Sequence, residues 1–285
     1  MSLLPSDFQF SQRSLQDYVD CPRRFQLRYL DQLAWPAVES EPLSEHEGRM
    51  QAGAAFHRLI QHYLVGVPAE RLSAMLDSED SNTTDLQRWW DNFLQFSNII
   101  PVEEQLVETT LSAPIQHYRL LAKYDLIHWA GEPGGARVTI YDWKTTQHKP
   151  PRQWLEGRLQ TRIYPYLLVQ AGNSMLEGDQ IQPEQVEMVY WFAEQPRDPQ
   201  IFSYSTERCQ ADHDYLLGLV TEIEALSEDD FRLTADETKC KFCTYRSLCD
   251  RGIAAGDIDP GEVFDDSAGG DEFELDFDQV AEIEF

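Results

Sequence analysis

Hydrophobic residues recur at helical spacing in several parts of the chain. Between residues 48 and 65, Phe56, Leu59 and Tyr63 follow the i, i+3, i+7 pattern of one helix face. Ser14 and Asp17 resemble a capping box, and Pro22 suits the first position of a second helix. Together these patterns predict helices within residues 11–30, 48–65, 85–97, 154–171 and 207–227, with an acidic connection at 39–47.

A different pattern, rich in β-branched and aromatic residues, predicts strands. These strands are expected at residues 104–112, 118–129, 137–143, 185–193 and 201–205. The link at residues 131–136 is rich in glycine and proline, which favours an antiparallel hairpin. If the hairpin is symmetric about Pro133 and Gly134, the numbers of opposed residues sum to 267. Asp125 then faces Asp142, since 125 plus 142 is 267.

The order of these elements is helices, three strands, a helix, two strands and a helix. This order predicts an α/β core with a mixed sheet. From Ala254 onward the composition shifts to Asp, Glu and Gly with isolated hydrophobic residues, which is typical of a segment that is disordered by itself. We therefore predict one domain over residues 1–253 and an acidic tail over residues 254–285.

The formal net charge of −27 at first argues against a nucleic-acid partner. The tail alone contributes −12, however, and residues 119–162 hold eight basic and four acidic side chains. This clustering favours a track for phosphates over scattered surface charge. The tail has three interpretations: a solubilising segment, a docking peptide for a protein partner, or a DNA mimic that occupies the basic track.

The chain has no run of roughly 18 apolar residues that could span a membrane. Its N-terminus also lacks the basic and apolar regions of a signal peptide. These features predict a cytoplasmic protein without a membrane partner.

Asp125, Asp142 and Lys144 are the first candidates for chemistry. Residues two apart on a strand share a face, and opposed Cβ atoms lie about 5 Å apart, so the three side chains would form one patch. Two carboxylates this close repel each other unless a cation separates them. Carboxylates suit Mg²⁺ or Mn²⁺, and a lysine beside them can stabilise negative charge on a phosphodiester. Taken alone, one Asp-x-Lys sequence is more often an exposed ion pair.

Several motifs together resemble the PD-(D/E)XK nuclease superfamily, and most closely its RecB-like branch. They are Lys123-Tyr-Asp125, Asp142-Trp-Lys144, Gln160-Thr-Arg-Ile-Tyr164 and, earlier, Gly53-Ala-Ala-Phe-His57. The resemblance implies a restriction-endonuclease-like core with His57, Asp125 and Asp142 as metal ligands. It also implies Lys144 as the catalytic lysine, with Gln160 and Tyr164 orienting phosphate or water. Ala122 stands where the family often has glycine, and Pro165 follows Tyr164, so the helix there is expected to kink.

Four cysteines form a second group, Cys21 near the N-terminus and Cys240, Cys243 and Cys249 near the end of the predicted domain. Four thiolates suit a [4Fe–4S] cluster or a structural zinc, and the spacing does not separate the two. One N-terminal cysteine with a C-terminal trio resembles the iron–sulfur staple of AddB-type and CRISPR-adaptation nucleases. Cys209 is predicted to be an ordinary packed thiol.

The sequence therefore predicts a metal-dependent DNA nuclease, an exonuclease acting on single strands or ends in repair, recombination or CRISPR adaptation. The alternative is a non-catalytic iron–sulfur subunit that binds DNA and retains the fold. The intact set of Asp125, Asp142 and Lys144 favours the nuclease.

Overall fold

The structure is a computed structural model that describes residues 3–34, 41–76, 82–97, 104–131, 136–172 and 180–252, without the side chains of 41–47 and 82–84. Its strands are β1 (Gln9–Ser11), β2 (Gln105–Ile115), β3 (Tyr118–Ala130), β4 (Arg137–Lys144), β5 (Val186–Phe192) and β6 (Gln200–Ser203). Its longer helices are α1 (Gln12–Asp20), α3 (Glu41–Leu64), α5 (Asn82–Ser97), α7 (Leu159–Ala171) and α8 (Thr206–Ala225). Shorter helical segments are α2 (Pro22–Phe25), η1 (Gln26–Leu30), α4 (Ala69–Ala74), α6 (Arg152–Gly157), η3 (Pro183–Gln185), η4 (Glu228–Asp230) and η5 (Glu237–Cys240).

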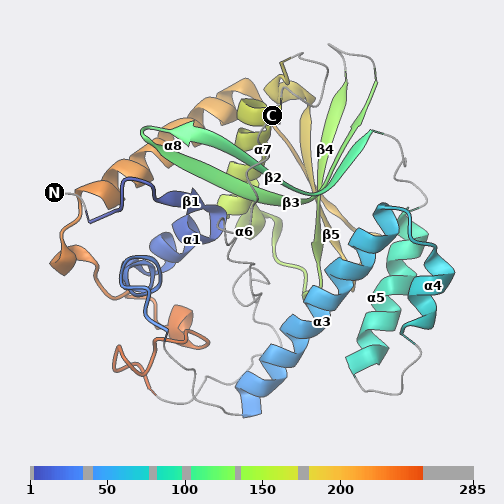
Figure 1. The fold of residues 1–285 in the computed structure, drawn as a ribbon, viewed down its shortest axis with the longest axis horizontal. Coiled ribbons are helices and arrows are strands. Elements are labelled where there is room, and N and C mark those ends of the chain that lie inside the picture. Colours follow the sequence, from blue (N-terminus) through green and yellow to red (C-terminus); the bar gives the residue numbers. More distant parts are fainter. Residues whose placement is uncertain are drawn as a thin grey trace, which may run out of the picture.

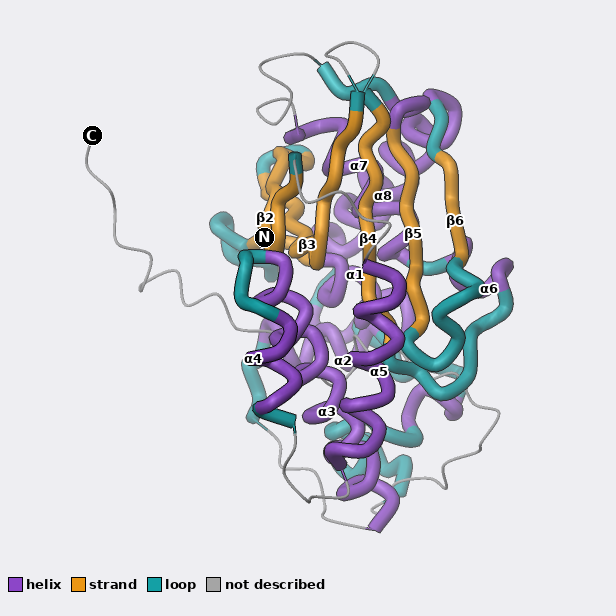
Figure 2. The backbone as a smooth tube through the Cα atoms, turned by 90° about the vertical axis from the view of Figure 1, so that its right-hand side faces the viewer, coloured by secondary structure: helices purple, strands orange, loops and turns teal. Residues whose placement is uncertain are grey.

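The six strands form one mixed sheet, as the sequence predicts. The order is β1-β3-β4-β5-β6, and β2 pairs with β3 in addition. β1 runs parallel to β3 and β4 runs parallel to β5, whereas the other pairs are antiparallel. Figure 2 shows β3, β4, β5 and β6 side by side in this sheet. The predicted α/β class is confirmed.

The predicted hairpin register is confirmed as well. β3 pairs with β4 from Leu126 opposite Tyr141 to Ala130 opposite Arg137, and each pair of numbers sums to 267. The pairing ends at Leu126 and Tyr141, so Asp125 and Asp142 lie just beyond the last paired residues. The hairpin thus brings the two carboxylates to one end of β4, as the turn composition and the numbering indicate.

Helices cover both faces of the sheet. α7 and α8 lie on one side, and α3, α4 and α5 lie together on the other, as Figure 1 shows. Alternation along β4 explains the two cores, because Val138 and Ile140 join the α7 side whereas Trp143 joins an aromatic cluster with Trp90 and Phe93 of α5. Each residue's position in its strand therefore decides which helix layer it meets.

The two ends of the described chain pack against each other, at the lower left of Figure 1. The rings of Phe25 and Phe231 stack with centroids 6.2 Å apart, and the backbone N–H of Arg23 donates to the carbonyl of Arg232. The Tyr245 hydroxyl donates to the carbonyl of Leu33 at 3.0 Å. These contacts bring the segment that follows Cys21 beside the segment that holds the other three candidate cysteines.

Three predicted helix positions need correction. α1 begins after Ser11, because the Ser11 and Ser14 side chains each accept a hydrogen bond from the other residue's backbone N–H; Ser14 is therefore not the cap. Residues 41–47 of the predicted acidic connection belong to α3, which begins at Glu41, whereas residues 39 and 40 lie outside the described residues. The helix predicted at 154–171 is divided into α6 and α7, since Arg158 adopts an extended backbone between them. The short elements β1 and α4 are not predicted.

The acidic tail, predicted over residues 254–285, lies outside the described residues. Among the described helices, none combines the length and the apolar character needed to cross a lipid bilayer.

Candidate functional site

Asp125 lies on β3 at the point where this strand changes its neighbour. Residues 119–121 pair with β1, whereas residues 126–130 pair with β4. Asp125 falls between the two segments, and its Oδ2 accepts a hydrogen bond of 2.8 Å from the backbone N–H of Trp143. The carboxylate thus takes the place of a backbone partner, which fixes its position relative to the end of β4.

Glu108 of β2 stands on the other side of Asp125. Val107 pairs with Leu126, so the register places Glu108 opposite Asp125. Glu108 has a φ of 51°, in the left-handed region that residues other than glycine rarely adopt. Backbone strain of this kind costs about 1–3 kcal/mol and is most common at functional sites.

His57, Glu108 and Asp125 form a compact group of possible metal ligands. One ligand atom from each lies within 4.8 Å of the other two, and His57 Nδ1 is 3.4 Å from Asp125 Oδ1. His57 comes from α3, which approaches the end of β4 so closely that a Cβ on Gly53 would lie 2.9 Å from the Thr145 hydroxyl. A glycine at position 53 therefore lets α3 bring His57 to the carboxylates.

The charges of this group act strongly on one another. Burial lowers the pKa of His57, but the carboxylates around it, chiefly Asp125 and then Asp142 and Glu108, together outweigh this effect and raise the pKa to about 9. Burial would raise the pKa of Asp125, yet His57 and the Trp143 N–H hold it below its usual value. The pKa of Glu108 is raised by burial and by the charge of Asp125. Two carboxylates and an imidazole in this arrangement are a suitable donor set for a divalent cation.

Asp142, Lys144 and Gln160 form a closed triangle beside this group. Lys144 Nζ lies 3.0 Å from Asp142 Oδ2 and donates to Gln160 Oε1 at 3.1 Å, and Gln160 Nε2 donates to Asp142 Oδ1. All three side chains are buried. Burial raises the pKa of Asp142 to about 6, an effect that Lys144 opposes and Asp125 reinforces. Asp142 Oδ2 is buried and faces the Lys144 ammonium, which compensates part of the charge of this carboxylate.

Tyr164 lies one helical turn after Gln160, on the same face of α7. Its backbone carbonyl accepts a hydrogen bond of 2.8 Å from the Tyr124 hydroxyl, and the two rings are 4.8 Å apart. Burial raises the pKa of Tyr164 well above its usual value. α7 continues across Pro165 as one helix, so the proline does not separate Tyr164 from Gln160.

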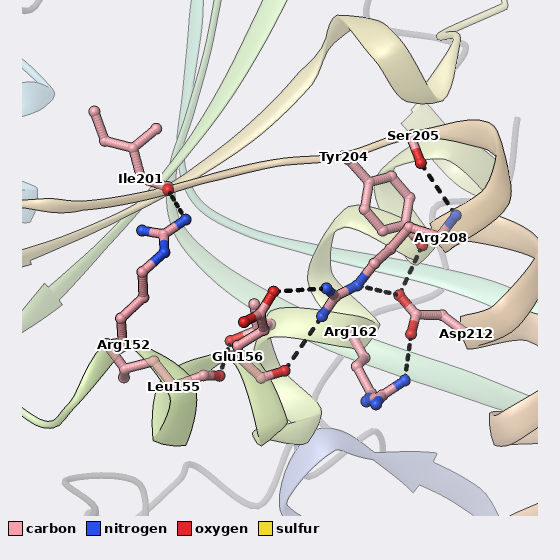
Figure 3. A network of polar contacts seen from close by, with 10 residues as sticks. Arg152, Leu155, Glu156, Arg162, Ile201, Tyr204, Ser205, Arg208 and Asp212 are labelled. Atoms are coloured by element: carbon pink, nitrogen blue, oxygen red, sulfur yellow. Dashed lines mark hydrogen bonds and ion pairs between the residues drawn. The ribbon is translucent and has the colours of Figure 1, made fainter.

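The opposite face of α7 is anchored by a network around Asp212 (Figure 3). Asp212 of α8 is fully buried, and Arg162 of α7 reaches it at 2.7 Å. The Tyr204 hydroxyl donates to the same carboxylate at 3.1 Å, and Arg208 connects it to Glu156 of α6. This network holds α7 against α8, while Gln160 on the other face of α7 meets Asp142 and Lys144.

The four cysteines predicted to share a site are brought into one region. Burial raises the pKa of Cys240, Cys243 and Cys249, and in each case the Cys21 thiolate adds to the increase. Cys21 therefore lies close enough to interact electrostatically with all three. Within the described part of the chain, however, no three of these sulfurs are as close together as the ligand atoms of the His57 group.

The basic segment at residues 119–162 is engaged with the protein itself. Lys123 contacts Glu108 at 2.7 Å, Arg137 contacts Glu187 at 3.5 Å, and Lys149 contacts Asp198. The remaining basic side chains contact Ser112, Asp142, Ile201, Trp154 and Asp212. A phosphate track along this segment stays a prediction, and DNA phosphates would have to compete with these internal partners.

The predicted nuclease-site residues lie around the end of β4 in the structure: His57, Asp125, Asp142, Lys144, Gln160 and Tyr164. Glu108 is the residue that the sequence analysis did not find. The sequence indicates only that Glu108 lies on the strand before the β3–β4 hairpin, and the residues around it form no recognisable motif.

Comparisons with known proteins identify the family to which this chain is similar. The family model of the PD-(D/E)XK nuclease superfamily matches residues 9–250, and no curated protein matches the chain. A crystal structure from Eubacterium rectale, described as a “putative exonuclease”, shares 8% identity, covers 75% of this chain and 79% of that chain, and has a TM-score of 0.47. The structure of SSO0001 shares 13% identity over 86% and 87% of the two chains, with a TM-score of 0.39.

The family model spans β1 to the last candidate cysteine, and so includes both groups of site residues. The mixed sheet with helices on both faces matches the restriction-endonuclease-like fold of that superfamily, whose members use divalent metals. This chain belongs to the PD-(D/E)XK nuclease superfamily.

Proposed function

We propose that the protein is a metal-dependent DNA exonuclease of the RecB-like branch, which acts on single strands or on DNA ends. The observation that carries this proposal is the position of the buried triangle of Asp142, Lys144 and Gln160 beside the ligand group of His57, Glu108 and Asp125. Its biological setting, on the same proposal, is DNA repair, recombination or CRISPR adaptation.

His57, Glu108, Asp125 and Asp142 would hold one or two Mg²⁺ or Mn²⁺ ions. Support comes from Glu108, whose pKa is raised by burial and by the charge of Asp125, because a cation between these carboxylates would relieve that cost. When bound, the metal supplies Lewis acidity toward a phosphate oxygen and lowers the pKa of water.

Lys144 and Gln160 have separate roles in the proposed hydrolysis. The Asp142 carboxylate holds the Lys144 ammonium at 3.0 Å, where its positive charge can stabilise the negative charge that develops on the phosphorus oxygens. Gln160 contacts both partners and so fixes their side-chain positions. Tyr164, on the same helix face, would orient phosphate or water. Since the triangle is buried, its geometry is set before substrate binds.

We also propose that Cys21, Cys240, Cys243 and Cys249 hold a [4Fe–4S] cluster that joins the two ends of the chain. Zinc at about 2.3 Å from four sulfurs would require them to lie only about 3.8 Å apart. Since no three of the described thiols are within 4.8 Å of one another, their spacing favours the larger cluster. Bound metal would also offset the burial and the mutual repulsion of the thiolates, both of which raise the pKa of Cys249.

Digestion of end-labelled DNA in Mn²⁺ tests the nuclease proposal. The wild-type protein should degrade linear single strands and leave circular single strands intact. Lys144→Met should lower the rate by about 10²–10³-fold, whereas Lys239→Met, which removes a contact with Asp20 outside the predicted phosphate track, should leave it nearly unchanged. Loss of activity in both variants, or in neither, would contradict the proposed role of Lys144.

The alternative, a non-catalytic subunit that binds DNA, makes the opposite prediction for Asp142→Ala. A binding module would keep its function, whereas the proposed nuclease would lose cleavage and keep its fold. For the cluster, iron and zinc are measured in the purified protein. Cys243→Ser should lose the brown colour and the iron, and Cys209→Ser, which changes the thiol outside the group, should keep both; zinc in place of iron would contradict the cluster.

A further inference from the structure

Gln16 of α1 contacts the first residue of α7, the helix that carries Gln160. Its Oε1 accepts a hydrogen bond of 3.3 Å from the backbone N–H of Leu159, which lies 143 residues later in the chain. Both residues are buried. The first N–H groups of a helix have no partner within it, and Arg158, which precedes α7, provides no side-chain cap. Gln16 therefore satisfies a backbone group that α7 itself does not.

The amide of Gln16 is oriented by a second contact. Its Nε2 donates to Asp20 Oδ1 at 3.2 Å, one helical turn along α1. An ionised carboxylate only accepts hydrogen bonds, so this contact assigns the nitrogen to Asp20 and leaves the oxygen for Leu159. Asp20 is held in turn by Arg24 and by Lys239, each at 3.1 Å, and so keeps a basic partner when either one is replaced.

The start of α7 is directly connected to the proposed catalytic lysine. Leu159 and Gln160 are consecutive residues of the helix, so a displacement of Leu159 also displaces Gln160. The Gln160 amide contacts both Lys144 and Asp142. A shift of the start of α7 would therefore change the distance between Gln160 and Lys144.

α7 has other anchors, so loss of the Gln16 contact should shift the helix without unfolding it. Arg162 reaches Asp212 of α8 at 2.7 Å, and the Thr161 hydroxyl lies 2.8 Å from the Tyr190 hydroxyl of β5. These contacts hold α7 toward α8 and β5, whereas Gln16 holds its start toward α1. One hydrogen bond changes the balance between aligned and displaced positions by about fivefold, because an interaction shifts an equilibrium only by its own net energy.

We propose that Gln16 is a positioning residue of the nuclease site, which keeps the Gln160 amide against Lys144 by holding the start of α7. Gln16 would act on the reaction only through Gln160. Its loss should therefore slow the cleavage step and leave the affinity for DNA unchanged. This inference rests on the proposed nuclease function, because only that function makes Lys144 a catalytic residue.

Single-turnover cleavage of end-labelled single-stranded DNA in Mn²⁺ measures the cleavage step, and binding of the same DNA in EDTA measures affinity. Gln16→Met, which removes both hydrogen bonds at similar length, should lower the rate about fivefold at unchanged affinity. Gln16→Glu keeps an oxygen for the Leu159 N–H, near a helix start that favours negative charge, and should restore most of the rate. Tyr18→Phe is the matched control with the wild-type rate, because it removes a contact of α1 with Glu222 instead of α7.

Hydrogen exchange of the Leu159 amide in the metal-free protein gives a readout that does not depend on cleavage. Exchange should be about fivefold faster in Gln16→Met than in the wild type, and unchanged in Tyr18→Phe. Gln16→Asn is one methylene shorter and should also lose the contact with Leu159. It replaces Gln16→Met should that variant fail to fold, with the same expected changes in rate and exchange.

An unchanged cleavage rate in folded Gln16→Met, or an equal loss in Gln16→Met and Gln16→Glu, would overturn the role of Gln16. So would a loss of DNA affinity at an unchanged rate, or unchanged exchange of the Leu159 amide. A wild-type protein that does not cleave DNA in Mn²⁺ refutes the nuclease proposal and with it this inference. A wild-type protein that cleaves DNA, with no response to Gln16→Met, refutes the role of Gln16 alone.

Discussion

Replacing Glu108 by glutamine separates two effects on stability: the repulsion within the metal-free ligand group and the stabilisation by bound metal. In the metal-free protein Glu108 is held near Asp125, and burial together with that charge raises its pKa. Glu108→Gln removes this repulsion at nearly constant size, but it also removes the ion pair with the half-exposed Lys123, which is worth at most about 1 kcal/mol. The two effects oppose each other, so the free energy of unfolding without metal should change by less than about 1 kcal/mol.

With metal present, the same substitution should have a clear cost. Loss of a carboxylate that helps to hold a metal weakens binding by about tenfold or more. At a metal concentration about 100 times the wild-type dissociation constant, binding stabilises the wild-type protein by about 2.7 kcal/mol. A tenfold weaker site leaves about 1.4 kcal/mol at the same concentration. The difference corresponds to about 3 °C in the midpoint of thermal unfolding for a protein of this size.

The measurement is thermal unfolding of wild-type and Glu108→Gln proteins with EDTA and with Mn²⁺. Glu187→Gln is the control, since Glu187 is a partly exposed carboxylate on β5 that pairs with Arg137 instead of the ligand group. We expect equal midpoints in EDTA and a smaller Mn²⁺-dependent rise only for Glu108→Gln. A full Mn²⁺-dependent rise in that variant would refute the assignment of Glu108 to the metal site.

Further predictions concern stability, pH and the cysteines. Arg162→Met should lower the free energy of unfolding by about 2–3 kcal/mol, because it leaves the fully buried Asp212 carboxylate with fewer partners. Arg137→Met breaks the exposed pair with Glu187 and should lower the free energy of unfolding by less than about 1 kcal/mol. Urea unfolding of both variants measures the difference. Between neutral pH and about 9, Mn²⁺ binding should strengthen by up to about tenfold per pH unit, because the carboxylates around His57, chiefly Asp125, raise its pKa to about 9 against the effect of burial, and only the neutral imidazole ligates metal. Calorimetric titrations at several pH values should show that increase level off above about 9, and a pH-independent affinity would exclude His57 as a ligand. Cys243→Ser should lower the midpoint of thermal unfolding through loss of the bound metal, and an unchanged midpoint with full iron content would exclude Cys243 from the site.

The hairpin and the residues on it are predictable because their signals are local. The composition of residues 131–136 predicts a hairpin, the observed register of β3 and β4 agrees with it, and the alternation of side chains then places Asp142 and Lys144 on one face. The motif around Gln160 also lies on a single helix face, so its position follows from helical spacing. For these residues, short-range geometry is enough to predict the arrangement that the structure has.

Other features depend on contacts between distant segments. Glu108 is one of 50 acidic residues, and only the pairing of β2 with β3 distinguishes it from the others. β1 has three residues and forms a strand because β3 lies beside it, and neither its length nor its composition indicates this. The break at Arg158 is similar, since the backbone N–H of Leu159 at the start of α7 donates to Gln16 of α1. Contacts of this kind have no signature in a single sequence.

The pairing of β1 with β3 has a consequence for the order in which the protein can fold. Phe10 of β1 lies opposite Leu120 of β3, so β1 has no partner in this sheet until 110 more residues have been synthesised. Phe25 stacks on Phe231, which is synthesised later still, so this contact can form only near the end of synthesis of the described chain. Contacts between such distant residues form slowly, and chains that end early expose apolar surface. We expect this protein to complete its fold only after synthesis of the whole domain, and its truncated fragments to aggregate.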